Sequence, residues 1–487
     1  MLIIKNVRIL DGENMSELCD IQIIDGKIAA ISRGVFDDGP IHSELSSVAE
    51  KPKVFDGQGR ICLPGLIDSH SHAAAAVFDP EIQLALLRQG VTTVIVGQDG
   101  IGFAPSDNNS LAWSENYFAG IDGSAIQITA GSMANWLAAY DEATALNVAA
   151  LVPHGSLRYL VAHTKSEPLN ETEIAEMGQL MATAFQEGAV GFSTGLEYVP
   201  AAWADNAELI ALLKITAKYD RVHNTHMRGY EDKAPTAMAE QIELAHLSGV
   251  TTNITHYHGD AKVLGQLLDD AANANVPMTF DSYPYLKGCS LLAMVSLPTW
   301  LPLANPTKTL ELITNNQATN QRLADHLATL DDLWPRTTMA WAQGTDPITG
   351  KEWDWVAGLT IPEIAQRLGT TNSDATLRLL VGTKLRASCV FAQPPTNSAE
   401  SVSTLADRPG HMAGSDGIFV PFAPAPTHHS RNHPRGWGAA TRWLTTKVLT
   451  GEWTWAEAVE HLSARAAERY GLGGRGQLAI GAPADLI

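Results

Sequence analysis

Two histidines separated by one residue, His70 and His72, are the first feature of the sequence that could do chemistry. They end the segment LPGLIDSHSH, whose apolar start is typical of a buried strand. In an extended segment, residues i and i+2 point to the same side, so both imidazoles can reach one metal ion. An isolated pair of this kind is more often incidental than functional, so the interpretation depends on further ligands.

Further candidate ligands follow other strand-like runs. They are Asp99 after VTTVIVG, His226 after RVHNT, His256 after VTTNIT and Asp416 after GHMAGS. Any one of these side chains could be a core histidine or a capping aspartate, but independent accidents would rarely place the whole set after strands. Imidazole and carboxylate ligands suit zinc, as one or two ions, or a neighbouring divalent metal such as manganese, iron or cobalt.

The elements that must position these residues are short apolar runs separated by helical stretches from Gly65 onward, which is typical of parallel strands with crossover helices. The runs are 63–69, 91–97, 147–153, 188–194, 221–225, 250–255, 276–282 and 410–415. Strands alternating with helices in this number predict an α/β fold, a (β/α)8 TIM barrel, in which the strand ends face the catalytic rim.

The two ends of the chain have β character and predict a small second domain. Residues 1–63 alternate apolar and polar residues, and the pairs Asp11-Gly12, Asp25-Gly26 and Asp56-Gly57 predict hairpin turns. The tail 474–487, ending in GQLAIGAPADLI, also has β character and should rejoin these strands.

The barrel domain should then span 64–473. Its last gap is too long for one crossover and contains the helix-like stretches KTLELI, QRLADHLATL and IPEIAQRLG. We interpret about 286–409 as an inserted subdomain that could cover the barrel mouth.

Composition excludes several classes of partner. The 53 acidic and 33 basic residues give a net charge of −20, which disfavours nucleic acid and anionic membrane surfaces. The 4 cysteines show no CxxC spacing, so a disulfide framework is not expected. The start lacks a signal-peptide pattern, and no apolar stretch is long enough to span a bilayer. We therefore expect a cytoplasmic enzyme with a small-molecule substrate, and the oligomeric state stays open.

A series of motifs narrows the assignment. In order along the chain these are LPGLIDSHSH, GVTTVIVGQDG, GFSTGLEYVPA, THMRGYED, THYHG, DSYPY, GSDG and HPRGWG. The series resembles that of the N-acyl-D-amino-acid deacylases, or D-aminoacylases, of the amidohydrolase superfamily. The resemblance covers nearly the whole chain and implies hydrolysis of an N-acyl-D-amino acid to a D-amino acid and a carboxylate. The ending GRGQLAIGAPADLI also resembles the closing motif of the superfamily, which implies that 474–487 packs with 1–63 as a β-sandwich.

The resemblance also implies roles for single residues. His226 and His256 would hold a tight metal ion together with a residue at the end of the second strand, and His70, His72 and Asp416 would line a second, weaker position. In the substrate pocket, Arg435 and Tyr283 would grip the substrate carboxylate, and Tyr198 would contact the substrate near the scissile amide.

Two positions depart from the family pattern. Asp99 stands where the family usually has cysteine; a carboxylate can still bridge two ions, but it is a harder ligand than a thiolate. His258 stands where the family tends to have a lysine that helps bind the substrate carboxylate. The metal preference and the strength of carboxylate binding are therefore expected to differ.

The predicted chemistry is attack of water on an amide. A bound divalent ion lowers the pKa of its water from ~15.7 towards ~7. Asp416 is the predicted catalytic residue, first as base towards that water and then as acid towards the leaving nitrogen. We expect His154 and Arg158 to support the rim, and His428, His429 and His433 to lie in a polar loop near the entrance.

Two alternatives stay open. One is a cyclic amide of the dihydropyrimidine or hydantoin type, or a small dipeptide, as substrate. Against a cyclic amide, the fourth run ends in GFSTG without the bridging lysine that many cyclic amidases carry there. The other is a binding protein that no longer holds metal, which a metal assay would distinguish.

Overall fold

The computed structural model describes residues 1–32, 52–124, 127–419 and 433–487. Its centre is an eight-stranded parallel sheet whose strands are neighbours in chain order. They are β7 (Leu66–Asp68), β9 (Val91–Val96), β10 (Asn147–Pro153), β11 (Gly191–Gly195), β12 (Val222–His226), β13 (Thr251–Ile254), β14 (Thr279–Ser282) and β18 (His411–Ala413). Each predicted run overlaps one of these strands, so the predicted barrel is confirmed.

The first and last barrel strands meet at their carboxyl ends. The backbone N–H of Ser69 donates to the carbonyl of Ala413 at 3.2 Å, and the N–H of Asp416 donates to His70 at 2.8 Å. Just beyond, β8 (Ser71–His72) pairs in parallel with β19 (Gly417–Ile418). The nearly closed barrel therefore brings together two segments that are more than 300 residues apart in the chain.

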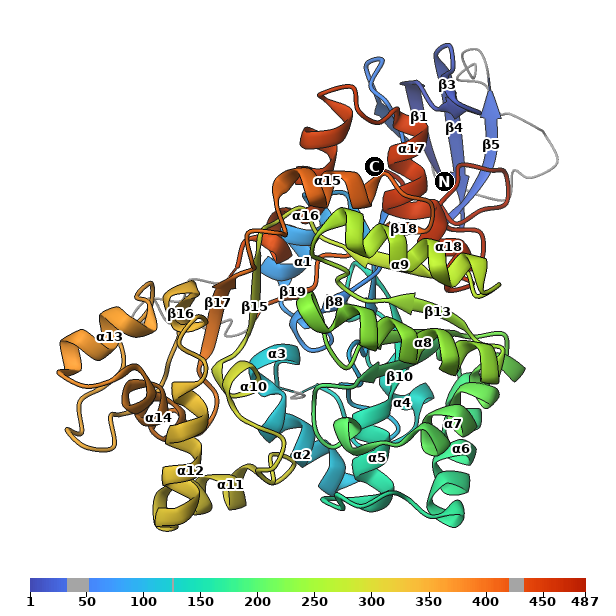
Figure 1. The fold of residues 1–487 in the computed structure, drawn as a ribbon. Coiled ribbons are helices and arrows are strands. Elements are labelled where there is room, and N and C mark those ends of the chain that lie inside the picture. Colours follow the sequence, from blue (N-terminus) through green and yellow to red (C-terminus); the bar gives the residue numbers. More distant parts are fainter. Residues whose placement is uncertain (33–51, 125–126, 420–432) are drawn as a thin grey trace.

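Helices cover the outside of the barrel (Figure 1). They are α1 (Pro80–Leu87), α2 (Asn108–Tyr117), α3 (Ala119–Asp122), α4 (Met133–Ala138), α5 (His154–Ala162), α6 (Glu171–Gln186), α7 (Asn206–Lys218), α8 (Ala234–Ser248), α9 (Ala261–Asn273), α15 (Ala399–Ala406), α16 (Arg435–Trp443), α17 (Trp455–Val459) and α18 (Arg465–Arg469). Asn170 caps α6 together with Glu173, and α8 ends at a left-handed Gly249. These local signals depend on neighbouring residues alone.

The barrel interior is packed with side chains. Ile67, Ile95, Leu151, Val222 and Met412 form one buried cluster inside the ring of strands. A packed interior of this kind makes the barrel a rigid frame, so the residues at its carboxyl ends are held in place rather than suspended over a pore.

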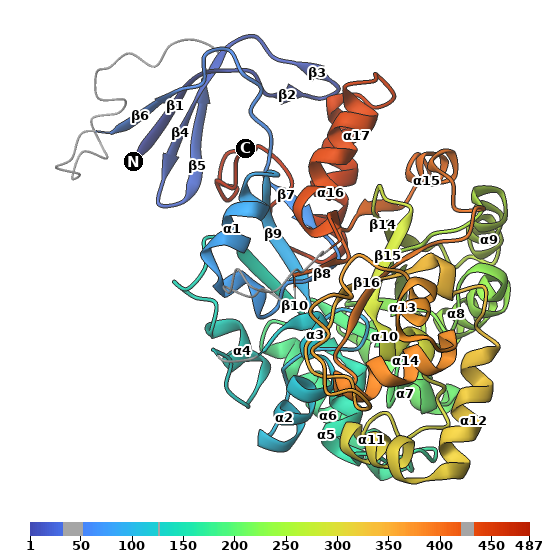
Figure 2. The ribbon, with the colours of Figure 1, turned by 90° about the vertical axis from the view of Figure 1, so that its left-hand side faces the viewer.

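The N-terminal segment forms a four-stranded sheet at one end of the molecule (Figure 2). Its strands are β1 (Leu2–Val7), β4 (Cys19–Ile24), β5 (Lys27–Ser32) and β6 (Lys53–Asp56), and a small ribbon of β2 (Leu10–Asp11) and β3 (Asn14–Met15) adjoins it. The predicted turn at Asp25-Gly26 joins β4 to β5 with both residues at positive φ. The predicted hairpin at Asp56-Gly57 is wrong, because β6 runs parallel to β1 and so does not pair with the segment that follows it.

The C-terminal tail returns to this sheet. The N–H of Ile28 donates to Ala482 at 3.0 Å, and that of Leu63 donates to Ile487 at 3.0 Å. Leu478, Ala484 and Leu486 pack against the buried side of the sheet. The tail therefore rejoins the N-terminal strands as expected, while the description as a sandwich, like the domain boundaries, stays a prediction.

The segment between β14 and β18 forms a separate lobe on the far side of the barrel from the N-terminal sheet (Figures 1 and 2). It has a three-stranded antiparallel sheet with the order β15-β17-β16. Its elements are β15 (Lys287–Leu291), α10 (Leu292–Ser296), α11 (Pro306–Asn315), α12 (Gln317–Ala328), β16 (Thr337–Trp341), α13 (Ile361–Leu368), α14 (Asn372–Gly382) and β17 (Ser388–Ala392). The three predicted helical stretches correspond to α11, α12 and α13.

The hydrophobic core of this lobe is built around Trp334, Trp353 and Leu379, and it also includes Val199, which follows barrel strand β11. Among the described residues, no helix is long and apolar enough to cross a bilayer.

Candidate active site

The six predicted metal ligands meet at the carboxyl end of the barrel. They are His70, His72, Asp99, His226, His256 and Asp416, and all are buried. We call them the mouth cluster. Each lies in or directly after a barrel strand or its extension, so the parallel strands bring together side chains from five separate parts of the chain.

One carboxylate oxygen lies at the centre of the mouth cluster. The distances from Asp99 Oδ2 are 3.8 Å to His70 Nε2, 3.6 Å to His72 Nε2, 3.8 Å to His226 Nδ1 and 3.5 Å to His256 Nε2. Ligands about 2.0–2.2 Å from a tetrahedral ion lie roughly 3.3–3.6 Å from one another. The spacing therefore suits ligands gathered around cations.

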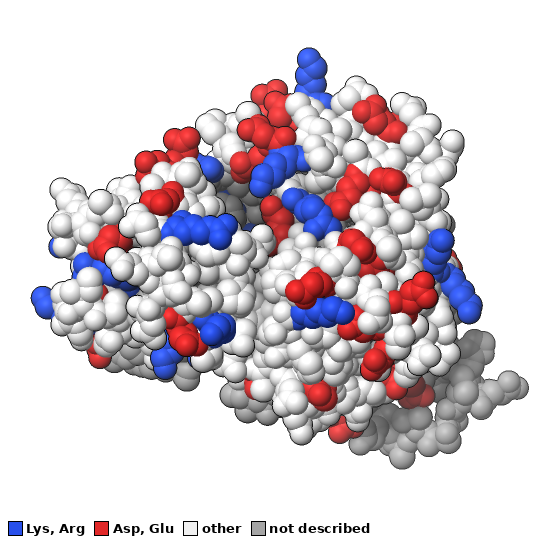
Figure 3. Space-filling view, turned by 60° about the horizontal axis from the view of Figure 1, so that its bottom comes forward, with Lys and Arg blue, Asp and Glu red and all other residues white. Residues whose placement is uncertain are grey.

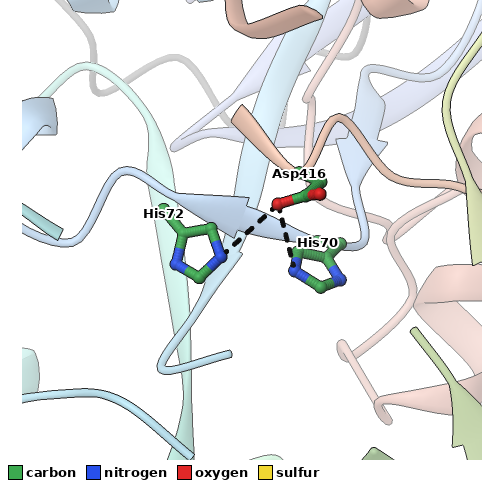
Figure 4. Close-up of side chains that lie close together, drawn as sticks. All are labelled: His70, His72 and Asp416. Carbon is green, nitrogen blue, oxygen red and sulfur yellow. Dashed lines mark ion pairs between the residues drawn. The ribbon is translucent and has the colours of Figure 1, made fainter. Parts of the chain in front are cut away.

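A second group of ligand atoms adjoins the first. Asp416 Oδ1 lies 3.8 Å from His70 Nε2 and 3.5 Å from His72 Nε2, and the carboxylate points toward both rings (Figure 4). The ligand atoms of His70, His72 and Asp416 all lie within 4.8 Å of one another, as do those of His70, Asp99 and His256. The cluster thus offers two adjacent cation positions.

The environment of His70 tests whether a cation fits. The ring is fully buried, and its Nε2 makes no hydrogen bond. A buried polar atom without a partner costs free energy, and a cation between Nε2 and the carboxylates would satisfy it. His226 Nδ1 and His256 Nε2 also lie only 2.9 Å apart, so a proton or a metal ion must separate their lone pairs. The residues therefore fit a divalent metal such as zinc.

Three members of the mouth cluster adopt an uncommon backbone conformation. The φ angles of Asp99, His256 and Asp416 are 54°, 36° and 48°. Left-handed backbone at residues other than glycine costs free energy, and it concentrates at functional sites where the surrounding fold enforces it. The close packing is also visible at Gly195, where a Cβ would collide with the backbone oxygen of Asp99.

Further carboxylates orient the histidines. His72 Nδ1 lies 2.9 Å from Asp122 Oδ1, and His70 Nδ1 lies 3.2 Å from Asp281 Oδ1. Such partners fix the ring orientation and leave the opposite nitrogen for a metal. Burial would lower the pKa of His72, but Asp122 and Asp99 outweigh it and raise this pKa to about 10. Metal binding at this ring must therefore displace a proton.

The His226 ring uses the opposite nitrogen from His70 and His72 to face Asp99. Its Nε2 lies 3.0 Å from Glu197, so Nδ1 faces Asp99. Burial would raise the pKa of Asp99, but the neighbouring histidines hold it well below its usual range.

Sequence reasoning missed Asp122, Asp281 and Glu197 as partners of the histidines. Glu197 and Asp281 lie inside the motifs LEYVP and DSYPY, which could have pointed to them, whereas Asp122 has no such signal.

A cavity of about 480 Å³ borders the mouth cluster. Five members of the cluster line it: His72, Asp99, His226, His256 and Asp416. The four predicted substrate-binding residues, Tyr198, His258, Tyr283 and Arg435, all line it. Apolar side chains from the lobe between β14 and β18 form another part of the wall: Met294, Val295, Leu297, Pro298, Leu330 and Phe391. On the face drawn in Figure 3 the surface is hollowed, and basic and acidic side chains are interspersed around the hollow.

Two of the predicted substrate-binding residues contact the histidines of the mouth cluster. The Tyr198 hydroxyl lies 3.3 Å from His226 Nδ1. His258 Nδ1 lies 2.6 Å from the carbonyl oxygen of His256, and its ring stacks on Tyr230 with centroids 5.3 Å apart.

The Arg435 guanidinium contacts a member of the mouth cluster directly. Nη1 lies 2.8 Å from Asp416 Oδ2, and Nη2 donates to the carbonyl of Cys289 at 3.2 Å. The guanidinium also lies over the Tyr283 ring, 4.8 Å from its centroid. Arg435 is therefore bound to the predicted catalytic residue.

His154 and Arg158 lie away from the ligands and form a separate buried group with Glu208. His154 Nε2 is 2.8 Å from Glu208, and Arg158 Nε is 3.2 Å from each of its oxygens. We call these three residues the support cluster.

The predicted entrance loop is described only in part. His428 and His429 lie outside the described residues, and His433 is buried and accepts a hydrogen bond from the Arg435 N–H.

The sequence is similar to that of known amidohydrolases. Residues 53–487 match the model of an amidohydrolase family. The chain is 28% identical to the D-aminoacylase of Alcaligenes xylosoxydans xylosoxydans, over 100% of this chain and 87% of the relative. It is 27% identical to the N-acyl-D-glutamate deacylase of the same organism, over 91% of this chain and 79% of the relative.

The fold is also similar to that of a solved deacylase structure. The N-acyl-D-glutamate deacylase of Bordetella bronchiseptica, complexed with zinc and a phosphonate inhibitor that mimics the tetrahedral intermediate, is 26% identical with a TM-score of 0.74. The match covers 100% of this chain and 89% of that one. With a family match across most of its length and a metal-ligand cluster at the barrel mouth, the chain belongs to the amidohydrolase family.

Proposed function

We propose that this protein is a metal-dependent hydrolase that cleaves the amide bond of N-acyl-D-amino acids to a D-amino acid and a carboxylate. The observation that carries the proposal is the mouth cluster, in which one oxygen of Asp99 faces four imidazoles. Three of these rings line a cavity that a buried guanidinium also lines. The relatives that bear the name deacylase support the choice of a linear N-acyl-D-amino acid.

The metal would be zinc, as one or two ions. His226, His256 and Asp99 would hold one ion, and His70, His72 and Asp416 would line the second position. Bound zinc supplies an acidified water and a Lewis acid for the carbonyl oxygen. Because Asp99 offers oxygen rather than sulfur, manganese, iron or cobalt would also suit the site.

Asp416 would move the proton. It takes one proton from the attacking water as the water oxygen bonds to the carbonyl carbon, and it returns this proton to the amide nitrogen as the C–N bond breaks. The products are a carboxylic acid, which ionises, and the free amine. The Tyr198 hydroxyl, 3.3 Å from His226 Nδ1, lies where it can donate to the carbonyl oxygen of the substrate.

The substrate carboxylate would lie between Arg435 and Tyr283. A guanidinium presents a planar set of donors that matches a carboxylate, and the Tyr283 hydroxyl can add a further donor. His258 adjoins the same cavity and would contribute a weaker polar contact than the lysine of the family. The lobe between β14 and β18 would act as an inserted subdomain that supplies the apolar wall for the acyl group or the side chain.

The decisive experiment presents zinc-loaded protein with N-acetyl-D- and N-acetyl-L-amino acids in parallel and measures the released amine. We expect release from the D-forms. Release from the L-forms alone would end the deacylase assignment, while release from neither would contradict the hydrolase itself.

Hydantoin and dihydrouracil belong in the same assay, because a cyclic amide was the second hypothesis. β11, the fourth barrel strand, carries the sequence GFSTG and has no lysine that could be carboxylated to bridge two ions. We therefore expect no ring opening under conditions that give full turnover of a linear substrate.

A further inference from the structure

Arg435 is a buried cation with one anionic partner among the described residues. Its side chain is 1% exposed, and its ion pair is with Asp416 Oδ2 at 2.8 Å. Its Nε makes no hydrogen bond although it is buried. The guanidinium lines the substrate cavity and so retains donor capacity that an incoming anion could use.

Both oxygens of Asp416 are engaged in this arrangement. Oδ1 faces His70 and His72 on the metal side, and Oδ2 is held by Arg435. The Oδ2 lone pair that Arg435 occupies cannot at the same time accept the proton of a water molecule. With Arg435 in this position, the proposed base is restrained.

A substrate carboxylate would compete for the same guanidinium. Of the Lys and Arg side chains among the described residues, the cavity is lined by Arg435 and Lys233, and Lys233 lies near the carboxylates of Glu197 and Glu231. His258 also lines the cavity, but its Nδ1 is engaged by the carbonyl oxygen of His256 at 2.6 Å, so Arg435 must serve two anions with little help.

We propose that Arg435 exchanges Asp416 for the substrate carboxylate, and that this exchange frees Asp416 Oδ2 to accept the proton of the attacking water. The inference rests on the proposed deacylase function. It makes Arg435 a residue that binds the substrate and, through Asp416, controls the rate of the chemical step. The carboxylate of the substrate then acts on kcat as well as on KM.

The first test uses the wild-type, zinc-loaded protein with N-acetyl-D-leucine and N-acetyl-D-leucinamide, which lacks the carboxylate. The apolar cavity wall makes leucine a suitable side chain. We expect kcat for the amide to be at least ~10-fold lower than for the acid, and sodium formate to restore part of it by occupying Arg435. Sodium chloride at equal ionic strength should restore nothing.

The outcomes of this test separate the two proposals. Equal kcat values with a difference only in KM would show that Arg435 grips the substrate without restraining Asp416, and the exchange would be wrong while the deacylase function stands. No amine release from either compound would contradict the deacylase function, and the exchange with it.

The second test measures binding to metal-free protein by calorimetry, so it does not depend on turnover. Asp416→Asn removes the anion that competes for Arg435, and N-acetyl-D-leucine should then bind at least ~5-fold more tightly, with N-acetyl-D-leucinamide unchanged. Glu197→Gln is the matched control, because it removes a cavity carboxylate that has no ion pair with Arg435. Equal tightening by both variants would indicate general charge repulsion and would overturn the exchange, as would unchanged or weaker binding to Asp416→Asn.

Discussion

Two buried groups among the described residues, the support cluster and the mouth cluster, both contain histidine and carboxylate side chains but differ in the spacing within them. In the support cluster, His154 and Arg158 lie 2.8 and 3.2 Å from Glu208, which are ordinary hydrogen-bond distances. In the mouth cluster, four ring nitrogens lie 3.5–3.8 Å from Asp99 Oδ2. The support cluster satisfies its own charges, whereas the mouth cluster is spaced for ions between its members. Spacing, more than residue type, distinguishes a structural group from a metal site.

The two clusters also differ in backbone conformation. Asp99, His256 and Asp416 have positive φ, whereas no residue of the support cluster does. A strained backbone persists only where the surrounding fold enforces it, as it does at the mouth.

The largest expected effect lies in the mouth cluster. Asp416→Asn should lower kcat by about 10²–10⁴-fold, because the variant loses the proposed proton shuttle. Zinc content, measured by elemental analysis of the purified variant, should stay close to that of the wild type. A variant with wild-type kcat would refute the role of Asp416.

The corresponding change in the support cluster should affect stability. Glu208→Ala leaves a buried guanidinium without its partner, which costs about 3–5 kcal/mol in the free energy of unfolding. Denaturant unfolding measures this loss. Zinc bound per folded molecule should not change, and a loss of zinc would mean that the two clusters are coupled and the contrast is false.

A smaller effect is expected at the partner of a ligand. Asp122→Asn keeps the shape of the contact with His72 Nδ1 but removes its charge. Metal affinity should fall about 10–100-fold, because a carboxylate partner orients the ring and raises its basicity. Competition with a chromogenic chelator measures the affinity, and wild-type affinity would show that Asp122 is only a structural neighbour.

The smallest effect is expected where one ligand replaces another. Asp99→Cys restores the residue common in the family, so zinc affinity should be retained or raised, since a thiolate is the softer ligand. Complete loss of zinc in the same competition assay would show that Asp99 is not a ligand.

Much of the site could be predicted from the sequence, for a physical reason. Parallel strands of a barrel present their carboxyl ends to one rim, so a histidine or aspartate that follows such a strand lies at the rim whatever the packing elsewhere. His226 after RVHNT and His256 after VTTNIT are of this kind. Capping at Asn170 and the turn at Asp25-Gly26 were predictable because they depend on neighbouring residues.

Other features depend on contacts between distant segments. The turn-like pair Asp56-Gly57 does not reveal that β6 will pair in parallel with β1, because strand direction is set by the partner. Asp122 reaches His72 only because α3 packs beside the barrel mouth.

The sequence by itself determined the barrel, the residue types of the candidate ligands and the rim on which they lie, because residue periodicity and strand direction depend on the local order of residues. Only the tertiary structure decided which oxygen of Asp99 faces the four imidazoles and that Arg435 binds Asp416. Those choices depend on side-chain packing across the barrel mouth, where His70 and Asp416, more than 300 residues apart in the chain, lie within 4 Å of each other.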